Sequence, residues 1–159
     1  MNDSVRKDAP CILLVEDDPG DQDLTRRAVT KGDIEITLTI AGDGAQALEM
    51  LANKEHFAAL SGRTCPDLIL LDLNLPKIDG YKVLETIRST PELKRIPVVA
   101  LTTSRQEEDI AMAYSLGVNS FLTKPNGLTE YIESLTKLVH YWFRVVALPP
   151  RGERVHAET

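Results

Sequence analysis

Side chains that can handle phosphate and a metal ion stand directly after short apolar runs of this sequence. The carboxylates are Glu16, Asp17, Asp18 and Asp72, the hydroxyls are Thr102, Thr103, Ser104 and Thr123, and the amine is Lys124. Carboxylates that are brought together repel one another, by about 4 kcal/mol per pair at about 4 Å in an effective dielectric near 20, unless a cation lies among them. Mg²⁺ suits that role, because it takes oxygen ligands, keeps several waters and often shares its coordination with a phosphate.

Asp72 differs from the other acids because it stands alone at the end of its apolar run. A carboxylate in that position can attack phosphorus and form an acyl phosphate. Lys124 would contact the phosphate oxygens as a point charge, and a Ser or Thr hydroxyl would donate a hydrogen bond to them. The pattern therefore predicts a phosphoryl acceptor that is assisted by Mg²⁺.

These residues can meet only if the apolar runs form neighbouring strands of one sheet. The runs are Cys11–Val15, Ile34–Ala41, Leu68–Leu71, Val98–Leu101 and Ser120–Leu122. All but the second are unbroken, as expected of strands buried on both faces of a parallel sheet, whereas the second alternates apolar and polar residues and is predicted to lie at an edge. In such a sheet ligands bind outside the carboxyl ends of the strands, so the residues that follow the runs converge on one rim.

Segments of helical period separate the runs and complete an α/β pattern. They are Asp21–Lys31, Gly44–Phe57, Gly80–Ser89, Gln106–Leu116 and Leu128–Leu148. We expect residues 56–66 to form a longer loop after the second helix. One folded unit is predicted over residues 11–148, preceded by a polar segment at 1–10 and followed by a polar, poorly ordered tail at 149–159.

The composition is that of one ordinary globular domain. Of 159 residues, 18 are Lys or Arg and 24 are Asp or Glu, which gives a formal charge of -6. This balance, without a cluster of basic residues, argues against nucleic-acid binding. No apolar stretch approaches the roughly 20 residues of a membrane span, and the first residues lack the apolar core of a signal peptide. We therefore expect a cytoplasmic protein with no membrane partner.

Four motifs resemble the receiver domain of two-component response regulators. They are VEDD at 15–18, DLILLDLNLPKIDG at 67–80, ALTTS at 100–104 and FLTKP at 121–125. The resemblance implies a flavodoxin-like (βα)5 fold, a doubly wound parallel sheet of strand order 2-1-3-4-5, in a signalling protein and not an enzyme. It implies that a sensor histidine kinase phosphorylates Asp72. It also implies that Asp17, Asp72 and the backbone carbonyl of Asn74 hold Mg²⁺, with Glu16 in the place of the family's first acidic residue.

The same resemblance assigns roles to the residues around the acceptor. Thr102 matches the switch hydroxyl and Lys124 matches the lysine of the family pattern. Phe121 stands at the aromatic switch position, which is often Tyr, so a tyrosine hydroxyl is missing there. Phosphorylation would draw Thr102 toward the phosphoryl group and let Phe121 turn inward. Asn74 and Ser104 would tune hydrolytic loss of the phosphoryl group, and the bond from Lys124 to the proline after it is expected to be cis.

The predicted last helix carries more apolar surface than a stripe facing the sheet requires. Its YWFRVVALP ending, together with LDLNLPKIDG and the long loop before Pro66, looks similar to single-domain regulators paired with bacterial phytochromes, which are commonly dimers. We therefore expect a homodimer, and a sensor kinase of the phytochrome kind as partner. The expected interface residues are Tyr141, Trp142, Val145, Val146 and Leu148. An overlong core helix is the alternative.

Acidic residues near strand ends can also cap helices. Asp18, which precedes a proline, is open between a metal ligand and a cap, whereas Asp43 and Asp79 are expected to be caps. Two other functions are also open: a haloacid-dehalogenase-like phosphatase, and a degenerate receiver that serves only as a dimerising scaffold. The phosphatase would need a second Asp two residues after its nucleophile, where this chain has Asn74. The intact set of acids, threonine and lysine weighs against the scaffold.

Overall fold

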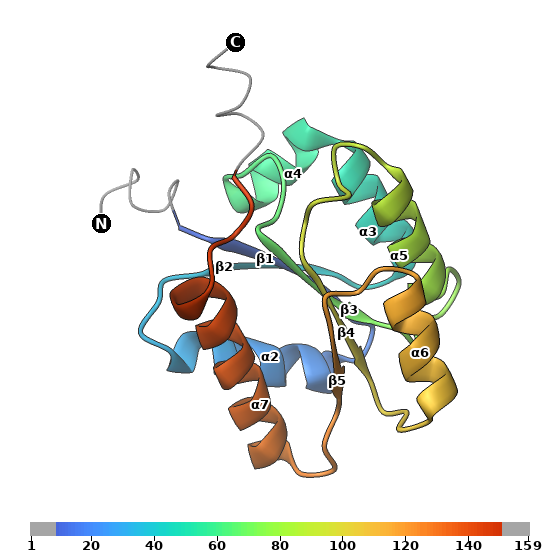
Figure 1. Ribbon diagram of the computed structural model, residues 1–159. Helices are drawn as coiled ribbons and strands as arrows, with labels where there is room; N and C mark the ends of the chain where they lie inside the picture. The colour runs from blue at the N-terminus through green and yellow to red at the C-terminus, as the bar shows by residue number, and fades with distance from the viewer. Residues whose placement is uncertain (1–8, 151–159) are drawn as a thin grey trace.

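The computed structural model describes residues 9–150 and shows a five-stranded parallel sheet with helices on both faces (Figure 1). The strands are β1 (Cys11–Val15), β2 (Thr37–Ala41), β3 (Leu68–Asp72), β4 (Val98–Thr102) and β5 (Ser120–Thr123). Their order is β2-β1-β3-β4-β5, which confirms the predicted flavodoxin-like topology and the edge position of the second strand. The three central strands are buried along their whole length, and this explains their unbroken apolar sequences.

Helices cover the sheet in two layers (Figure 1). They are α2 (Pro19–Lys31), α3 (Gly44–Ala52), α4 (Lys54–Ser61), α5 (Gly80–Ser89), α6 (Glu107–Ser115) and α7 (Leu128–His140), followed by the π-helical turn η1 (Tyr141–Val145). The helices α2 and α7 pack on one face of the sheet, and α3, α5 and α6 lie over the other. The apolar core therefore has two halves, one on each side of the sheet.

The pleat of each strand decides which half its side chains join. In β1, Leu13 and Val15 pack on the α3/α5 side, while Ile12 and Leu14 pack on the α2/α7 side. The next residue on the α2/α7 side, just past the end of the strand, is Glu16.

Continuing this alternation past the other strand ends sorts the predicted site residues into two groups. Asp72 and Lys124 fall on the α2/α7 side, with Glu16. Thr102 and Phe121 fall on the α3/α5 side, where Phe121 packs against the core. The charged residues and the two proposed switch residues are thus separated by the plane of the sheet.

The second predicted helix is in fact two helices, and the loop expected over residues 56–66 is shorter than predicted. Asn53 interrupts the helix in an extended conformation, and its side chain accepts a hydrogen bond from the backbone N–H of His56 at 3.0 Å. Helix α4 continues to Ser61 and ends at Gly62, whose positive φ of 78° favours glycine. The side-chain cap of Asn53 competes with continuation of α3 and starts a new helix at this point.

The last helix is shorter than the predicted Leu128–Leu148. Helix α7 ends at His140, the chain makes one wide turn through η1, and Val146 is extended. The run YWFRVV is almost entirely apolar, so no polar boundary marks the end of the helix in the sequence. Residues 1–8 and 151–159, which contain most of the predicted N-terminal segment and tail, lie outside the described residues. Within residues 9–150, no helix combines the length and apolar character that a membrane crossing requires.

Candidate functional site

A buried lysine joins three acids at the carboxyl end of the sheet. The Nζ atom of Lys124 donates hydrogen bonds to Glu16 Oε1 and to Asp21 Oδ2, each at 2.7 Å. It also donates to Asp72 Oδ2 at 3.3 Å. Lys124, Glu16 and Asp72 are all buried, so water and salt screen these ion pairs only weakly. An ammonium group has three N–H donors, and here each of them has a carboxylate partner.

Three acids form a compact cluster of oxygen atoms on this rim. One carboxylate oxygen from each of Glu16, Asp17 and Asp72 lies within 4.8 Å of the other two. Asp17 is exposed, so water molecules can complete a coordination shell on its side. Oxygen donors with access to water are what a hard divalent cation requires. These residues therefore fit such an ion.

Burial controls the protonation of this cluster when no cation lies within it. Burial, reinforced by the neighbouring Asp72 carboxyl, raises the pKa of Glu16 to about 8, although Lys124 acts in the opposite direction. Burial alone would lower the pKa of Lys124, but its hydrogen bonds to Asp21 and Glu16 outweigh this effect and raise the pKa above its ordinary value. Lys124 therefore stays charged at neutral pH, whereas Glu16 tends to keep a proton.

Asn74 and Thr102 lie on the other side of Asp72. The backbone N–H of Asn74 donates to Asp72 Oδ1 at 2.9 Å and so orients the carboxylate. The Asn74 side-chain Nδ2 donates to Thr102 Oγ1 at 2.9 Å, and the backbone N–H of Ser104 donates to the same oxygen at 3.2 Å. The buried Thr102 hydroxyl thus accepts two hydrogen bonds, and its own proton is left to donate to an anion. Phe121 is half-buried on the same side of the sheet.

Three acids near strand ends are helix caps. Each accepts a hydrogen bond from the backbone N–H three residues further on, at 3.2 Å for Asp18, 2.7 Å for Asp43 and 2.9 Å for Asp79. Asp43 and Asp79 are therefore the caps that the sequence predicts. Asp18, which the sequence left open, caps α2.

Asp21 is a site residue that the sequence did not reveal. It lies in the first turn of α2, where an acid is expected simply because it stabilises a helix N-terminus. Its hydrogen bond to Lys124 joins residues 103 positions apart, so no local pattern could indicate it.

The peptide bond between Lys124 and Pro125 is not cis. Residues 9–150 contain no cis peptide bond, so the expectation from the resemblance is wrong. The trans form is favoured by about 0.5–1 kcal/mol even before proline. In addition, the backbone N–H of Lys124 donates to Thr102 O at 2.7 Å and keeps this segment aligned with β4.

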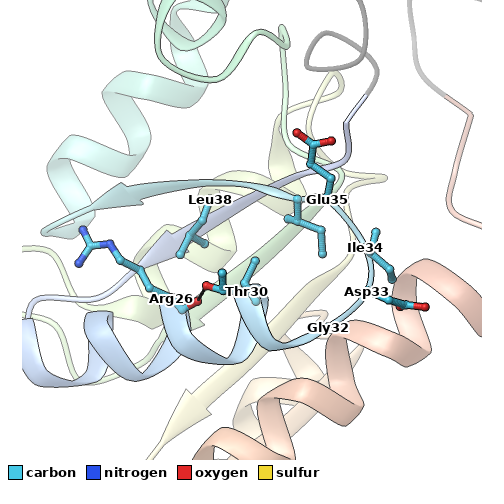
Figure 2. Close-up of a pocket in the computed structure, with 9 residues that line it drawn as sticks. Arg26, Thr30, Gly32, Asp33, Ile34, Glu35 and Leu38 are labelled. Carbon is cyan, nitrogen blue, oxygen red and sulfur yellow. Dashed lines mark hydrogen bonds between the residues drawn. The ribbon is translucent and has the colours of Figure 1, made fainter. Parts of the chain in front are cut away.

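Two hollows of the surface lie away from the acids. One, of about 510 Å³, lies beside α2 and the segment that leads into β2, where Arg26, Asp33 and Glu35 flank Ile34 and Leu38 (Figure 2). The other, of about 640 Å³, is lined by α3, α5 and the loops beside them. Neither is lined by the acids or the lysine described above. These two hollows are therefore separate from the acid cluster.

The predicted interface residues after α7 divide into two groups. Trp142 is half-buried and packs against the α2/α7 half of the chain's own core, and Val146 and Leu148 are also half-buried. Tyr141 and Val145 are 49% and 62% exposed. The apolar surface that a second molecule could cover is therefore centred on Tyr141 and Val145.

Known proteins resemble this chain over most of its length. The response regulator receiver domain matches residues 12–136. Response regulator Rcp1 of Synechocystis sp. is 41% identical over 138 residues, which make up 87% of this chain and 92% of Rcp1. The crystal structure of Rcp1 in its Mn²⁺-bound form superposes with a TM-score of 0.79 at 40% identity, covering 89% of this chain and 99% of that one. The phosphorylated cyanobacterial phytochrome response regulator RcpA gives a TM-score of 0.81 at 40% identity over the same shares. The chain therefore belongs to the response regulator receiver domain family, whose members are signalling domains that bind a divalent metal and act with sensor histidine kinases.

Proposed function

We propose that Asp72 is the phosphoryl acceptor of this receiver. The observation that carries the proposal is the hydrogen bond from buried Lys124 to Asp72 at 3.3 Å, with the carboxylates of Glu16 and Asp17 beside it. An oxygen of Asp72 forms a bond to phosphorus while the P–N bond of a kinase phosphohistidine breaks, and the imidazole nitrogen keeps the electron pair of that bond.

Positioning and charge neutralisation supply the catalysis. The Asn74 N–H and the Lys124 ammonium each hold one oxygen of the Asp72 carboxylate, so the group is kept in one orientation. Glu16, Asp17, Asp72 and the backbone carbonyl of Asn74 would hold Mg²⁺. When bound, that ion supplies positive charge opposite the phosphoryl oxygens. Lys124 supplies the remaining positive charge from the protein itself.

Thr102 and Phe121 would read out the phosphorylation. The phosphoryl group adds about -1.5 to -2 charge and strong acceptor oxygens. If the Thr102 hydroxyl moves toward the phosphoryl group to donate its proton, it leaves the position where Asn74 and Ser104 donate to it, and Phe121 can then turn into the space on the α3/α5 side. Ser104 Oγ also donates to Asp109 Oδ2 on α6 at 2.5 Å, so this movement would extend to α6. Asn74 and Ser104 flank the acceptor and would tune slow self-dephosphorylation.

Incubation with acetyl phosphate and Mg²⁺, followed by intact-mass measurement, tests the proposed function. A single labile phosphate on the parent protein would support the acceptor. Steady turnover of small phosphate esters would instead indicate the phosphatase, and a chain that gains no phosphate under these conditions would be a scaffold.

Mg²⁺ binding is expected to weaken as the pH falls below about 8, because the ion must displace the proton that Glu16 then carries. Because folding raises the pKa of Glu16 from its ordinary value near 4.5, this group adds to the free energy of unfolding. The contribution is fully present below about pH 4.5 and is lost as the pH rises through about 8. Calorimetric titration at about pH 6.5 and about pH 8.5 should give a Kd that is roughly tenfold higher at the lower pH. Glu16→Gln should remove most of this pH dependence. Equal Kd values for the parent at both pH values would contradict the prediction.

We also infer that the partner kinase is of the bacterial phytochrome kind. RcpA, which is similar over 89% of this chain, is a cyanobacterial phytochrome response regulator. That likeness supports the same pairing here.

We further propose a homodimer formed through η1. Tyr141 and Val145 are exposed, and a polar surface would be expected on a turn that contacts only water. Size-exclusion chromatography with light scattering should give twice the 17.6 kDa of one chain for the parent, and Val145→Glu should give the monomer mass. Leu60→Glu, at an apolar residue of α4 that is 50% exposed, is the control and should remain dimeric. A monomeric parent would rule this proposal out.

A further inference from the structure

Tyr131, at the start of α7, carries a buried hydroxyl that has no hydrogen-bond partner. The residue is only 3% exposed. Its Oη is the one buried side-chain nitrogen or oxygen of residues 9–150 that meets neither a donor nor an acceptor. A phenol can both donate and accept, and an unpaired polar group in the interior disfavours the state that contains it. A phenylalanine would fill the same space without this cost, so the hydroxyl is better explained by a second state of the protein.

Tyr131 lies on the side of the sheet that carries the charged residues of the acceptor site. Tyr131 packs in the α2/α7 half of the core with Leu14 of β1 and Leu101 of β4. This is the side of the sheet on which Lys124 lies. Burial raises the pKa of Tyr131 well above its usual value; the charge of Lys124 acts against this shift, and the carboxylates of Asp21, Glu16 and Asp72 add to it. The group therefore remains an O–H donor in the charged surroundings of the site.

Lys124 has no N–H to spare for a phosphoryl group. Its three donors are used by Glu16, Asp21 and Asp72, so contact with a phosphoryl oxygen requires that one of them be released. Glu16 and Asp72 belong to the oxygen cluster that a cation would hold in place. Asp21 is not one of the acids of that cluster. It comes from α2, which packs beside α7. Asp21 is thus the partner that Lys124 releases at least cost.

We propose that Tyr131 is a positioning residue for phosphoryl transfer, whose hydroxyl donates to the Asp21 carboxylate when Lys124 turns toward the phosphoryl group on Asp72. This inference rests on the proposed role of Asp72. The new hydrogen bond satisfies both the carboxylate that has lost its cation and the phenol that had no partner. It makes the movement of Lys124 less costly and holds the start of α7 against α2 while Lys124 is engaged elsewhere.

Tyr131→Phe separates this role from simple packing, because it removes the hydroxyl and keeps the ring. Without phosphorylation, the melting temperature of the variant should equal or exceed that of the parent. With acetyl phosphate and Mg²⁺, its maximal phosphorylation rate should fall about tenfold, as expected for the loss of a hydrogen bond to a charged group. The acetyl phosphate concentration at half-maximal rate and the Kd for Mg²⁺ should not change, because Tyr131 contacts neither. Tyr114→Phe, at an exposed tyrosine of α6, is the matched control and should behave as the parent in every measurement.

A double-mutant cycle with Asp21→Asn identifies the partner of the hydroxyl. In the background of Asp21→Asn, Tyr131→Phe should have at most a twofold further effect on the rate. Independent effects that multiply would overturn the proposal, as would a Tyr131→Phe variant that is phosphorylated like the parent. A fall in melting temperature that accompanies slower phosphorylation would also overturn it, since this would indicate a packing role. If the parent itself gains no phosphate on Asp72, the proposed function fails as well. If the parent and Tyr131→Phe are phosphorylated equally well, only the role of Tyr131 is ruled out.

Discussion

Asp72→Asn is expected to abolish the labile phosphate that the parent gains from acetyl phosphate and Mg²⁺. An amide lacks the anionic oxygen that attacks phosphorus and cannot form an acyl phosphate. The nearest other buried carboxylate, Glu16, is 1% exposed and is bound by Lys124 at 2.7 Å, so it does not offer a substitute nucleophile. Intact-mass spectrometry should show close to one phosphate per parent chain, and the phosphorylation rate of the variant should be lower by at least about a hundredfold.

Asp79→Asn is the matched control for this loss. It makes the same change of acid to amide at an exposed residue that follows the same strand, and asparagine also caps helices well. This control should be phosphorylated at the parental rate. If Asp72→Asn still gained a labile phosphate, the acceptor would be another residue and the assignment of the site would fail.

Lys124→Met is expected to lower the free energy of unfolding at neutral pH by about 3–5 kcal/mol in the absence of divalent metal. The substitution leaves the buried Asp72 carboxylate without its cation and Glu16 without its ammonium donor, and burial is what makes unpaired charge costly. In the parent, folding raises the pKa of Lys124 above the ordinary lysine pKa of 10.5. The stabilisation by the lysine charge is therefore fully present below about pH 10.5 and is lost only as the pH rises through the raised pKa. The deficit of the variant should therefore be large at neutral pH and should shrink in acid, where the carboxyls are protonated.

Urea denaturation at about pH 5 and about pH 7.5 measures this difference, with Lys82→Met as the control. Lys82 is exposed on α5, so its loss should change the free energy of unfolding by less than about 0.5 kcal/mol. Added Mg²⁺ should restore part of the stability of Lys124→Met, because a cation held by the remaining acids replaces the missing charge. A loss below about 1 kcal/mol at neutral pH would show that Lys124 is not the main counter-charge of these acids.

Much of the fold follows from local sequence. The unbroken apolar runs that became β1, β3 and β4 are needed wherever a strand is covered on both faces, and the alternation in β2 marks an edge strand. Asp43 and Asp79 are caps because a short acidic side chain before a helix satisfies a free backbone N–H. The end of α7 could not be predicted in this way, since apolar residues continue across it, and the break after α3 comes with the side-chain cap of Asn53.

The candidate site was predictable in part for the same reason. Once parallel strands are recognised, their carboxyl ends must meet, and Glu16, Asp17, Asp72 and Lys124 follow from their places in the chain. Which acids Lys124 contacts was decided only by packing. Asp21 reaches it from α2, and the Tyr131 hydroxyl is buried in α7 on the same side of the sheet, because the pleat of the sheet and the docking of two helices place these side chains there. Periodicity along a chain describes what each residue does within its own element. The distances between atoms of different elements arise only when those elements pack, and here they decide which carboxylate holds the lysine and which hydroxyl has no partner.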